Sequence, residues 1–484
     1  MRRRPVKTND ILSGQFGLEG IRWALRGQPV RRKLRNAIGS LLPNPARLGA
    51  FYLRRSKYKP GSRLTAYYDI HLSAPDRQKT NHRLIEVDWR PMDRNDRPLK
   101  LPDAVEKQSV VMQEVAERSG LAAPFLRLAA ELPTLGIRIQ VYPLDPHFPQ
   151  LVSLSNPHYV RDRLESEGLI DLDGRKNQSE SKVVITPIRY RPGERHVLRV
   201  DVTGVNGSGE EATTFFAKLY DVSGDGARRM RVANQVADWL DTSGIGVDSA
   251  RPSAYLIEDE ALLYPEVTGV PLSQSLHRPG RKVAHNLSLA GAALRTLHEA
   301  PDSLLEVLPP KTLDSEIKVI QRAAQHIHIL LPQAGAKIER ILGLIQEIHQ
   351  RLPGEPPTFT HSDFKADHLR VSGKGLTLID FDTCSLADPA SDIGKFLADL
   401  RFWYEFYGQP GVELAQEQFL SGYGLRDADI RVLRASLYEA LVLIKITIRR
   451  VPLFDRNWAV RTQGLIDRSG QLLGTLTARI GSLP

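Results

Sequence analysis

The segment from Thr360 to Gly394 constrains this chain more than any other part of the sequence. It sets charged residues and histidines around two short apolar stretches, which we expect to be strands at Leu369–Val371 and Leu376–Ile379. The side chains before the first strand are His361, Asp363, Lys365 and His368, and those after the second strand are Asp380 and Asp382. An antiparallel pair of strands returns the chain on itself, so a hairpin would bring the two groups together in space.

This set of side chains suits phosphoryl transfer from ATP. That reaction needs a carboxylate to hold the acceptor hydroxyl and a pair of ligands to hold Mg²⁺ on the phosphates. We expect Asp363 to orient the hydroxyl and Lys365 to neutralise phosphate charge. His368 and Asp380 are then the expected metal ligands.

The same segment resembles the catalytic core of the aminoglycoside phosphotransferase and choline kinase family, the small-molecule branch of the protein-kinase-like fold. The family pattern is H-x-D-x-x-x-x-N, followed by a D-F/W-x metal motif and then by D-P-x-x-D. The matching residues of this chain are His361, Asp363, Asp380, Asp388, Pro389 and Asp392. The resemblance implies that His361 and Asp363 are catalytic, and that Asp388 and Asp392 have structural roles around the catalytic loop. Lys365 resembles the lysine in the H-R-D-L-K loop of protein Ser/Thr kinases.

Two departures from the family pattern concern the metal ligands. His368 stands where the family has Asn, and Asp382 adds a carboxylate after Asp380. Imidazole nitrogen suits Mn²⁺, Fe²⁺ or Zn²⁺ better than Mg²⁺, which prefers hard oxygen ligands. His368 therefore either binds a metal other than Mg²⁺, or donates a hydrogen bond to phosphate and leaves the metal to Asp380 and Asp382.

The residues before this core fit the small antiparallel N-lobe sheet that the resemblance implies. Its first three strands are expected at Ser181–Arg189, His196–Val202 and Thr213–Tyr220. Pro192 and Gly193 mark a turn between the first two strands. This turn takes the place of the family's glycine-rich lid, so the resemblance implies that Arg191 and Gly193 contact the nucleotide. Lys218 lies on the third strand, as the family's ATP-binding lysine does.

The helix expected next, Ala227–Leu240, lacks the glutamate with which the family usually orients that lysine. Asp238 is the available substitute, although its side chain is shorter. Together with His368 in place of the Asn, this leaves open a nucleotide-binding pseudokinase or regulatory protein. A protein kinase is a third alternative, suggested by Lys365 but disfavoured because no A-P-E element follows Asp392.

Two further strands, Ala254–Ile257 and Ala261–Tyr264, are expected before the chain leaves the sheet at Pro265. The segment that follows resembles the hinge that grips adenine in the family. We expect the carbonyl of Glu266 and the amide of Val267 to make these contacts, because Pro265 has no N–H to donate.

The rest of the chain is expected to form a mainly helical C-lobe. Apolar residues recur at helical spacing in two stretches. They are Val283, Leu287, Ala290, Leu294 and Leu297 in the first, and Ile430, Leu433, Leu437, Leu441, Ile444 and Ile448 in the second. The aromatic run Phe402–Tyr407 is the candidate wall of the acceptor pocket, since aromatic rings can hold a quaternary ammonium group. Packing in the core is the alternative role for this run.

Positive charge is concentrated at the start of the chain. Residues 1–60 contain 15 Lys and Arg against Asp10 and Glu19, a net charge of +13, so the other residues carry −3 of the overall +10. Ile21–Leu42 has the pattern of a basic amphipathic helix, which can lie on an anionic membrane surface or on nucleic acid. It can equally dock on its own protein or on an acidic partner. If residues 1–48 form a separate arm, deleting residues 1–45 should leave catalysis intact.

The segment after this arm contains a parallel to the N-lobe. Ser56–Ile70 aligns with Ile188–Val202 without gaps, and the coincident pairs are Tyr58/Tyr190, Pro60/Pro192, Gly61/Gly193, Arg63/Arg195 and Asp69/Asp201. Residues 49–175 are therefore either a duplicated, non-catalytic N-lobe or an unrelated module whose turn residues coincide.

Composition adds little to these motifs. Hydrophobic residues make up 41% of the 484 and charged residues 25%, as in soluble globular proteins. A single cysteine, Cys384, fits a reducing cytosol. No apolar run has membrane-spanning length and no secretory signal is recognisable, so we expect a cytoplasmic protein.

The sequence thus predicts an α+β, two-lobed protein-kinase-like fold with an extra N-terminal α+β module. The expected parts are a basic arm at 1–48, the module at 49–175, the N-lobe at 176–265 and the helical C-lobe at 266–484. The predicted activity is transfer of the ATP γ-phosphate to a hydroxyl of an aminoglycoside-, choline- or sugar-like small molecule. Mg²⁺ is the expected metal, with Mn²⁺ as the alternative.

Overall fold

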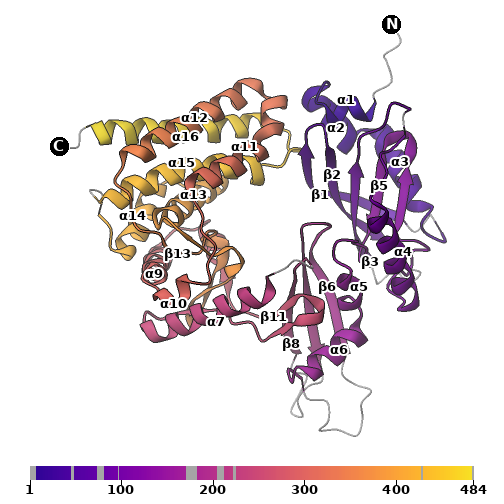
Figure 1. Ribbon diagram of the computed structural model, residues 1–484, viewed down its shortest axis with the longest axis horizontal. Helices are drawn as coiled ribbons and strands as arrows, with labels where there is room; N and C mark the ends of the chain where they lie inside the picture. Colours follow the sequence, from indigo (N-terminus) through magenta and orange to yellow (C-terminus); the bar gives the residue numbers. More distant parts are fainter. Residues whose placement is uncertain are drawn as a thin grey trace. The chain divides into compact units, whose positions relative to one another are not determined.

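The computed structural model describes residues 7–44, 48–73, 81–95, 97–170, 182–203, 212–221, 225–426 and 429–481. The chain divides into two compact units, of which the first is built on two β-sheets and the second is mainly helical (Figure 1). The first unit contains Met1–Gly226, Ser253–Glu266 and Pro452–Asp455, and the second contains Ala227–Pro252, Val267–Val451 and Arg456–Pro484. The predicted boundary at residues 175 and 176, and Ser181 of the first predicted N-lobe strand, lie outside the described residues.

The first sheet is antiparallel, with the strand order β1-β2-β3-β5-β4. Its strands are β1 (Leu48–Lys59), β2 (Arg63–Leu72), β3 (Asn81–Trp89), β4 (Ala129–Leu132) and β5 (Ile137–Val141). Helix α4 (Asp103–Arg118) lies between β3 and β4 in the sequence. Side chains alternate between the two faces of a strand. Along β2, Leu64, Ala66 and Ile70 are therefore buried on one face, while Thr65 and Asp69 lie on the other.

Three short helices pack on the first sheet through their apolar sides. They are α1 (Thr8–Leu12), α2 (Gly17–Arg26) and α3 (Gln28–Gly39). The hydroxyl of Tyr68 on β2 donates to the Leu25 carbonyl oxygen at 3.1 Å, and Arg35 donates to the Gly49 carbonyl oxygen at 2.8 Å. The expected single helix over Ile21–Leu42 is split at Gly27, whose backbone is extended. Of the alternatives for this segment, the structure shows docking on its own protein, so its apolar side is not free to lie on a membrane.

Deleting residues 1–44 is therefore expected to unfold the first unit, contrary to the expectation for a separate arm. The deletion removes apolar side chains that are at most 2% exposed, namely Ile11, Leu12, Ile21, Leu25, Leu34 and Ile38. Burying one such side chain contributes about 1.5–3 kcal/mol, so the total is comparable with the roughly 5–15 kcal/mol that stabilises a whole domain. Thermal melting of the truncated protein checks this, with Arg32→Gln on the exposed side of α3 as the control. A cooperative melt at the native temperature would contradict it.

The second sheet repeats the topology of the first. Its elements are β6 (Lys182–Arg191), β7 (Arg195–Thr203), β8 (Ala212–Leu219), β10 (Ala254–Leu256) and β11 (Ala261–Pro265), in the spatial order β6-β7-β8-β11-β10. Helix α7 (Gly226–Ser243) follows the third strand in sequence, just as α4 follows β3. The predicted N-lobe strands are confirmed, and the shared strand order supports the hypothesis of a duplication.

The register of the two sheets reveals one reversal of charge. Counted from the hairpin turns, Thr65 on β2 corresponds to Val197 on β7. Thr65 lies opposite Asp88, whereas Val197 lies opposite Lys218. Asp88 is buried and accepts hydrogen bonds from the Thr65 hydroxyl at 2.9 Å and from Arg90 Nε at 2.8 Å. Because a carboxylate repels phosphate, we expect no ATP site on the first sheet.

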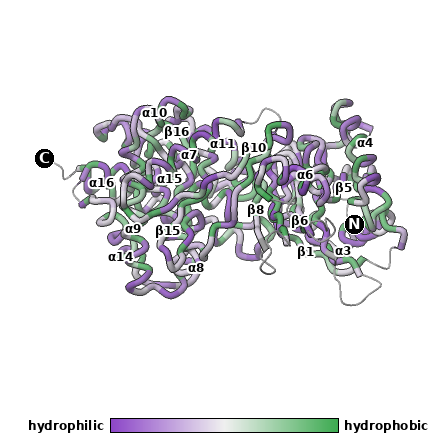
Figure 2. The backbone as a smooth tube through the Cα atoms, turned by 90° about the horizontal axis from the view of Figure 1, so that it is seen from below, coloured by the Kyte–Doolittle hydropathy of each residue, from purple (hydrophilic) through white to green (hydrophobic). Residues whose placement is uncertain are grey.

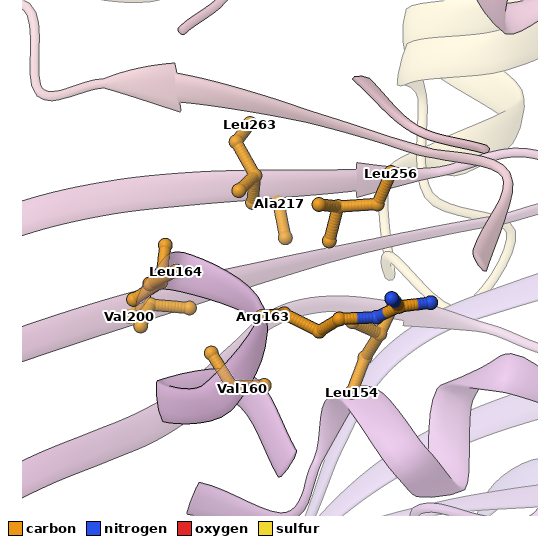
Figure 3. Close-up of a pocket in the computed structure, with 8 residues that line it drawn as sticks. All are labelled: Leu154, Val160, Arg163, Leu164, Val200, Ala217, Leu256 and Leu263. Atoms are coloured by element: carbon orange, nitrogen blue, oxygen red, sulfur yellow. The ribbon is translucent and has the colours of Figure 1, made fainter. Parts of the chain in front are cut away.

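Helices α5 (Gln150–Leu154) and α6 (Pro157–Ser166) lie in one apolar core with the second sheet. Figure 3 shows a small cavity there, between α6 and the strands. The residues that line it are Leu154, Val160, Arg163, Leu164, Val200, Ala217, Leu256 and Leu263. Its volume is about 10 Å³, which is about the space of one water molecule. The cavity is therefore a packing gap and not a ligand site.

The second unit is a helical body. Its long helices are α9 (Arg281–His298), α11 (Leu313–Leu330), α12 (Pro332–Arg351), α13 (Ala390–Tyr407), α14 (Val412–Tyr423), α15 (Ile430–Arg450) and α16 (Trp458–Gly481). The first predicted helical stripe is confirmed as the buried side of α9. The second is confirmed on α15 at Leu433, Leu437, Leu441 and Ile444, whereas Ile430 and Ile448 at its ends are half-buried. Helices α13 and α15 meet at Gly394, where a Cβ would lie 2.5 Å from the Ala435 carbonyl oxygen, so a larger residue does not fit. Hydropathy varies along each helix (Figure 2), and among the described helices none is long and apolar enough to cross a membrane.

Candidate active site

The predicted hairpin of the Thr360–Gly394 segment is confirmed in the second unit. Strands β14 (Leu369–Ser372) and β15 (Gly375–Leu378) pair antiparallel, within a sheet of order β12-β14-β15-β9 that also contains β9 (Val247–Ser249) and β12 (Val270–Pro271). The hairpin brings His368 Nε2 to 3.3 Å from Asp380 Oδ2. His368 Nδ1 lies 3.8 Å from Asp363 Oδ2. Asp363, which precedes β14, and Asp380, which follows β15, therefore both lie near His368.

The loop that carries these residues is fixed by two buried carboxylates of α13. Asp392 accepts hydrogen bonds from the backbone amides of His361 at 2.6 Å and Ser362 at 2.8 Å. Asp399 accepts one from the Ala366 amide at 2.8 Å. Ser362 has a φ of +61°, an unfavourable conformation for a residue with a side chain. The hydrogen bonds to Asp392 hold the loop in this conformation.

Asp399 was not predicted from the sequence. It lies seven residues after Asp392, which is two turns of helix, so both carboxylates project from the same side of α13. That spacing is the signal by which it could have been found. Asp388 lies just before the helix and forms an ion pair with Arg434 of α15. It therefore joins the start of α13 to α15.

Asp363 lies between two lysines. Lys365 Nζ is 2.6 Å from Asp363 Oδ2, and Lys395 Nζ of α13 is 3.2 Å from Asp363 Oδ1. Burial alone would raise the pKa of the Asp363 carboxyl, but the charges of Lys395 and Lys365 hold that pKa well below its usual range. Asp363 is therefore an anion at neutral pH, suited to orient a hydroxyl by accepting its hydrogen bond. Lys365, which we expected to face phosphate, is paired with Asp363, and Lys395 was not predicted at all.

The donors around His368 fit a divalent metal ion. The 3.3 Å between His368 Nε2 and Asp380 Oδ2 matches the spacing of two ligands bound at about 2.0–2.2 Å to one ion. Burial lowers the pKa of His368 to about 3, so its imidazole is neutral and keeps a lone pair for a metal. Asp380 has a φ of +72°, and Asp382 is buried in the turn that follows it. Both nitrogen and carboxylate donors are thus available.

His361 has a different environment from the one we expected for a catalytic group. Its side chain is buried, and its Nε2 lies 3.3 Å from the carbonyl oxygen of Ile379 at the end of β15. Its ring contacts Phe364 and Phe381, with centroids 5.9 Å and 5.0 Å away. The ring of His361 therefore lies between the loop and the hairpin, in contact with both.

The predicted lid turn of the second sheet is fastened to the preceding part of the first unit. The Gly193 amide donates to Asp145 Oδ2 at 2.8 Å, and His196 Nε2 is 2.7 Å from the same oxygen. Glu194 forms an ion pair with Lys57 of β1. The amide of Gly193, a residue that we expected to contact the nucleotide, therefore already has a partner. Burial, Arg55 of β1 and Arg189 of β6 lower the pKa of Arg191 to about 10.

Two of the remaining expected nucleotide contacts, Lys218 and Glu266, lie along the pair of strands β8 and β11, with Lys218 opposite Leu262 and Glu266 next to Thr214. Lys218 Nζ lies 5.0 Å from the centre of the Tyr264 ring on the neighbouring strand β11. The Glu266 amide donates to the Thr214 carbonyl oxygen at 3.0 Å, so pairing with β8 continues to this residue. Asp238 of α7, the proposed substitute for the family's glutamate, is exposed and paired with Arg251 at 2.7 Å.

A cavity adjoins the catalytic loop among α11, α13 and α15. Its wall includes Ser362 of the loop. The charged residues of the wall are three lysines and three carboxylates, namely Lys311, Lys395, Lys445, Glu316, Asp388 and Asp392. Lys311 and Lys445 share one carboxylate, that of Glu316, at 3.0 Å and 2.7 Å. The aromatic run Phe402–Tyr407 does not line this cavity. Its rings stack on one another instead, with Phe402 and Phe406 centred 6.2 Å apart.

Comparison with known proteins identifies the family. Residues 193–435, half of the chain, match the model of the phosphotransferase enzyme family. The chain belongs to this family, as the catalytic-loop motifs predicted. The match confirms a small-molecule phosphotransferase, and with the two antiparallel sheets and the helical unit it confirms the α+β, two-lobed kinase-like fold class. No curated protein sequence matches the chain significantly.

Solved structures of three kinases resemble this chain. A choline kinase from Cryptosporidium parvum Iowa II has 13% sequence identity and a TM-score of 0.44, over 66% of this chain and 97% of that chain. A choline/ethanolamine kinase family protein from Mesorhizobium loti has 14% identity and a TM-score of 0.43, over 65% and 98%. An aminoglycoside phosphotransferase in a ternary complex with streptomycin and ATP has 16% identity and a TM-score of 0.40, over 64% and 95%.

Proposed function

We propose that this protein transfers the γ-phosphate of ATP to a hydroxyl group of a small molecule, with the second unit supplying the catalytic groups. The observation that carries the proposal is the group formed by Asp363, His368 and Asp380 at the two ends of one hairpin. Phosphoryl transfer depends mainly on positioning and on electrostatic stabilisation. A fixed loop with an ionised carboxylate beside a pair of metal donors meets both needs.

The proposed roles follow from the contacts of each side chain. Asp363 accepts the hydrogen bond of the acceptor hydroxyl and aims its oxygen at the phosphate, while Lys365 and Lys395 keep the carboxylate ionised. His368, Asp380 and Asp382 would hold the divalent ion, which supplies charge neutralisation on the phosphates. Lys218 on β8 is proposed to bind ATP phosphates, with the backbone of Glu266 and Val267 near adenine.

The lysine-lined cavity favours an acceptor that carries an anionic group. The wall also carries the carboxylates of Asp388 and Asp392, but Asp388 is paired with Arg434 and Asp392 accepts the amides of the catalytic loop. Lys311 and Lys445 therefore share the one carboxylate of Glu316, and positive charge is in excess next to these two lysines. Burial, with Lys311 and Lys395 nearby, lowers the pKa of Lys445 to about 8 although Glu316 opposes the change. A carboxylate or phosphate group on the acceptor would relieve this repulsion. Polycationic aminoglycosides and choline would increase it, so we propose a hydroxylated acid or a sugar phosphate instead.

A coupled ATPase screen tests the proposal. We expect turnover with a hydroxylated carboxylate or sugar phosphate and none with matched amino sugars or choline. For the acceptor so found, Lys445→Met should raise KM about tenfold or more, since it removes a charge-assisted contact of roughly 1.5–3 kcal/mol. Lys318→Met, on the exposed side of α11, is the matched control and should leave KM unchanged. Turnover of cationic acceptors alone would contradict the anionic class, and ATP binding without any turnover would favour the pseudokinase alternative.

We place this activity in the cytoplasm, where ATP is available and where the buried free thiol of Cys384 stays reduced. The outward side of α3 carries exposed Arg31, Arg32 and Lys33. These charges remain available to an acidic partner, although the apolar side of the same helix is buried.

A further inference from the structure

Three side chains with metal-binding groups gather on the polar face of the first sheet, in the first unit and outside the catalytic hairpin. His71 on β2 lies directly opposite His82 on β3, and their ring centroids are 3.9 Å apart. Asp69 precedes His71 by two residues, so both point to the same face of the strand. Asp69 Oδ1 lies 3.3 Å from His82 Nδ1, and one ligand atom from each of the three residues lies within 4.8 Å of the others.

We propose that Asp69, His71 and His82 bind one Zn²⁺ ion, or a similar transition-metal ion, and so join strand β2 to strand β3. Zinc bonds of about 2.0–2.1 Å in a tetrahedron place neighbouring ligand atoms about 3.3 Å apart. The distance between Asp69 Oδ1 and His82 Nδ1 equals this edge. Two imidazoles and one carboxylate disfavour Mg²⁺ and Ca²⁺, which prefer oxygen donors. Three protein ligands leave the fourth position to water.

The surroundings of Asp69 orient it for this role. Arg54 Nη2 donates to Asp69 Oδ2 at 2.7 Å, which directs the other oxygen, Oδ1, toward His82. Partners that orient a ligand in this way raise metal affinity. The ring of Tyr52 contacts His71 edge-on, with centroids 5.0 Å apart. The His82 side chain is 49% exposed, so an ion can enter from solvent.

The second sheet provides an internal comparison. The equivalents of Asp69, His71 and His82 by register are Asp201, Thr203 and Ala212. Asp201 is retained, but it is engaged by Arg199 Nε at 2.8 Å and by the Thr214 hydroxyl at 2.7 Å. Both histidines are absent from these positions. The donor set is therefore a property of the first sheet and not of the topology that the two sheets share.

Titration of the metal-free, full-length protein with Zn²⁺ in a calorimeter tests this site. His71→Asn and His82→Asn should each weaken binding of one Zn²⁺ equivalent by at least about tenfold. His158→Asn, on the exposed side of α6, is the matched control and should bind Zn²⁺ as the wild type does. The active-site donors can also take Zn²⁺, so Asp380→Ala should keep the equivalent that His82→Asn loses. His82→Asn should keep the wild-type phosphotransfer rate.

A second measurement uses thermal stability in place of calorimetry. Binding to the folded state alone raises the melting temperature, so Zn²⁺ should raise it in Asp380→Ala protein, where the active-site donor set is incomplete. The same ion should not do so in the Asp380→Ala, His82→Asn double variant. If the His71 and His82 variants bind Zn²⁺ with wild-type stoichiometry and affinity, the two rings are only a packed cross-strand pair and the proposal is overturned.

Discussion

Replacing Asp363 with Asn is expected to lower kcat on the order of a thousand-fold while MgATP binding changes little. Asn keeps the size of the side chain but offers the acceptor hydroxyl a weaker, uncharged partner. A positioned carboxylate of this kind contributes about 10²–10⁴-fold to such reactions. The change also removes the charge that pairs with Lys395 and Lys365. Steady-state kinetics and calorimetry with ATP measure the two effects separately.

The matched control is Asp248→Asn, which removes an exposed carboxylate on β9, in the sheet that contains the hairpin β14–β15. It should leave kcat, KM and ATP affinity unchanged. Because Asp363 is in contact with a buried lysine, a melting curve is needed to show that the Asn variant is folded. Near-normal kcat in a folded Asp363→Asn enzyme would contradict the role proposed for this carboxylate.

The parts of this fold that follow a local pattern could be predicted from the sequence. The hairpin β14–β15 and the helices α9 and α15 have apolar residues at the spacing that their structures require. Asp392, for which the motif implied a structural role around the catalytic loop, accepts hydrogen bonds from the His361 and Ser362 amides of that loop. In each case the residues that form the pattern belong to the same short segment as the structure that the pattern predicts.

Features that depend on contacts between distant segments could not be predicted in this way. Asp145 holds the turn at Gly193 from 48 residues earlier in the chain, and nothing at either position signals the pairing. Lys395 lies within an apolar stretch of α13, where only the fold shows that it faces Asp363. The N-terminal basic charge was visible in the sequence. Whether the apolar side of α2 would face solvent or the first sheet was decided by packing.

The charge reversal between the sheets combines both kinds of information. The sequence suggested a duplication from coincident turn residues, but it could not align the third strands. Opposite residues of the second and third strands are 23 positions apart in the first sheet, at Thr65 and Asp88, and 21 apart in the second, at Val197 and Lys218. The pairing of Thr65 with Asp88 and of Val197 with Lys218 supplies that alignment. The first sheet has the buried carboxylate of Asp88 at the position that corresponds to Lys218, the lysine proposed to bind ATP. If the first sheet is a duplicated lobe, it can hold the turn at Gly193 without competing for ATP. Its contacts with Gly193 and Glu194 fit that use.

Replacing Asp380 with Ala is expected to reduce turnover by at least about a hundred-fold, the effect of losing a principal electrostatic contact in the transition state. The variant leaves His368 without the carboxylate that lies 3.3 Å from its Nε2. It thereby removes an anionic donor from the proposed metal site. Turnover should recover little at high Mg²⁺ or Mn²⁺, because the missing carboxylate is not replaced by raising the concentration of the ion.

Replacing His368 with Asn is the informative companion to that variant. It restores the hard oxygen donor that Mg²⁺ prefers, so the enzyme should stay within about tenfold of the wild-type rate and shift its preference from Mn²⁺ toward Mg²⁺. Rates measured with each ion, for the wild type and for both variants, give the comparison, and His285→Asn on the exposed side of α9 is the control. If His368 instead donates a hydrogen bond to phosphate, His368→Asn should lower kcat equally with both ions. An unchanged ranking of the metals would therefore remove His368 from the proposed ligand set and leave Asp380 and Asp382 to hold the ion.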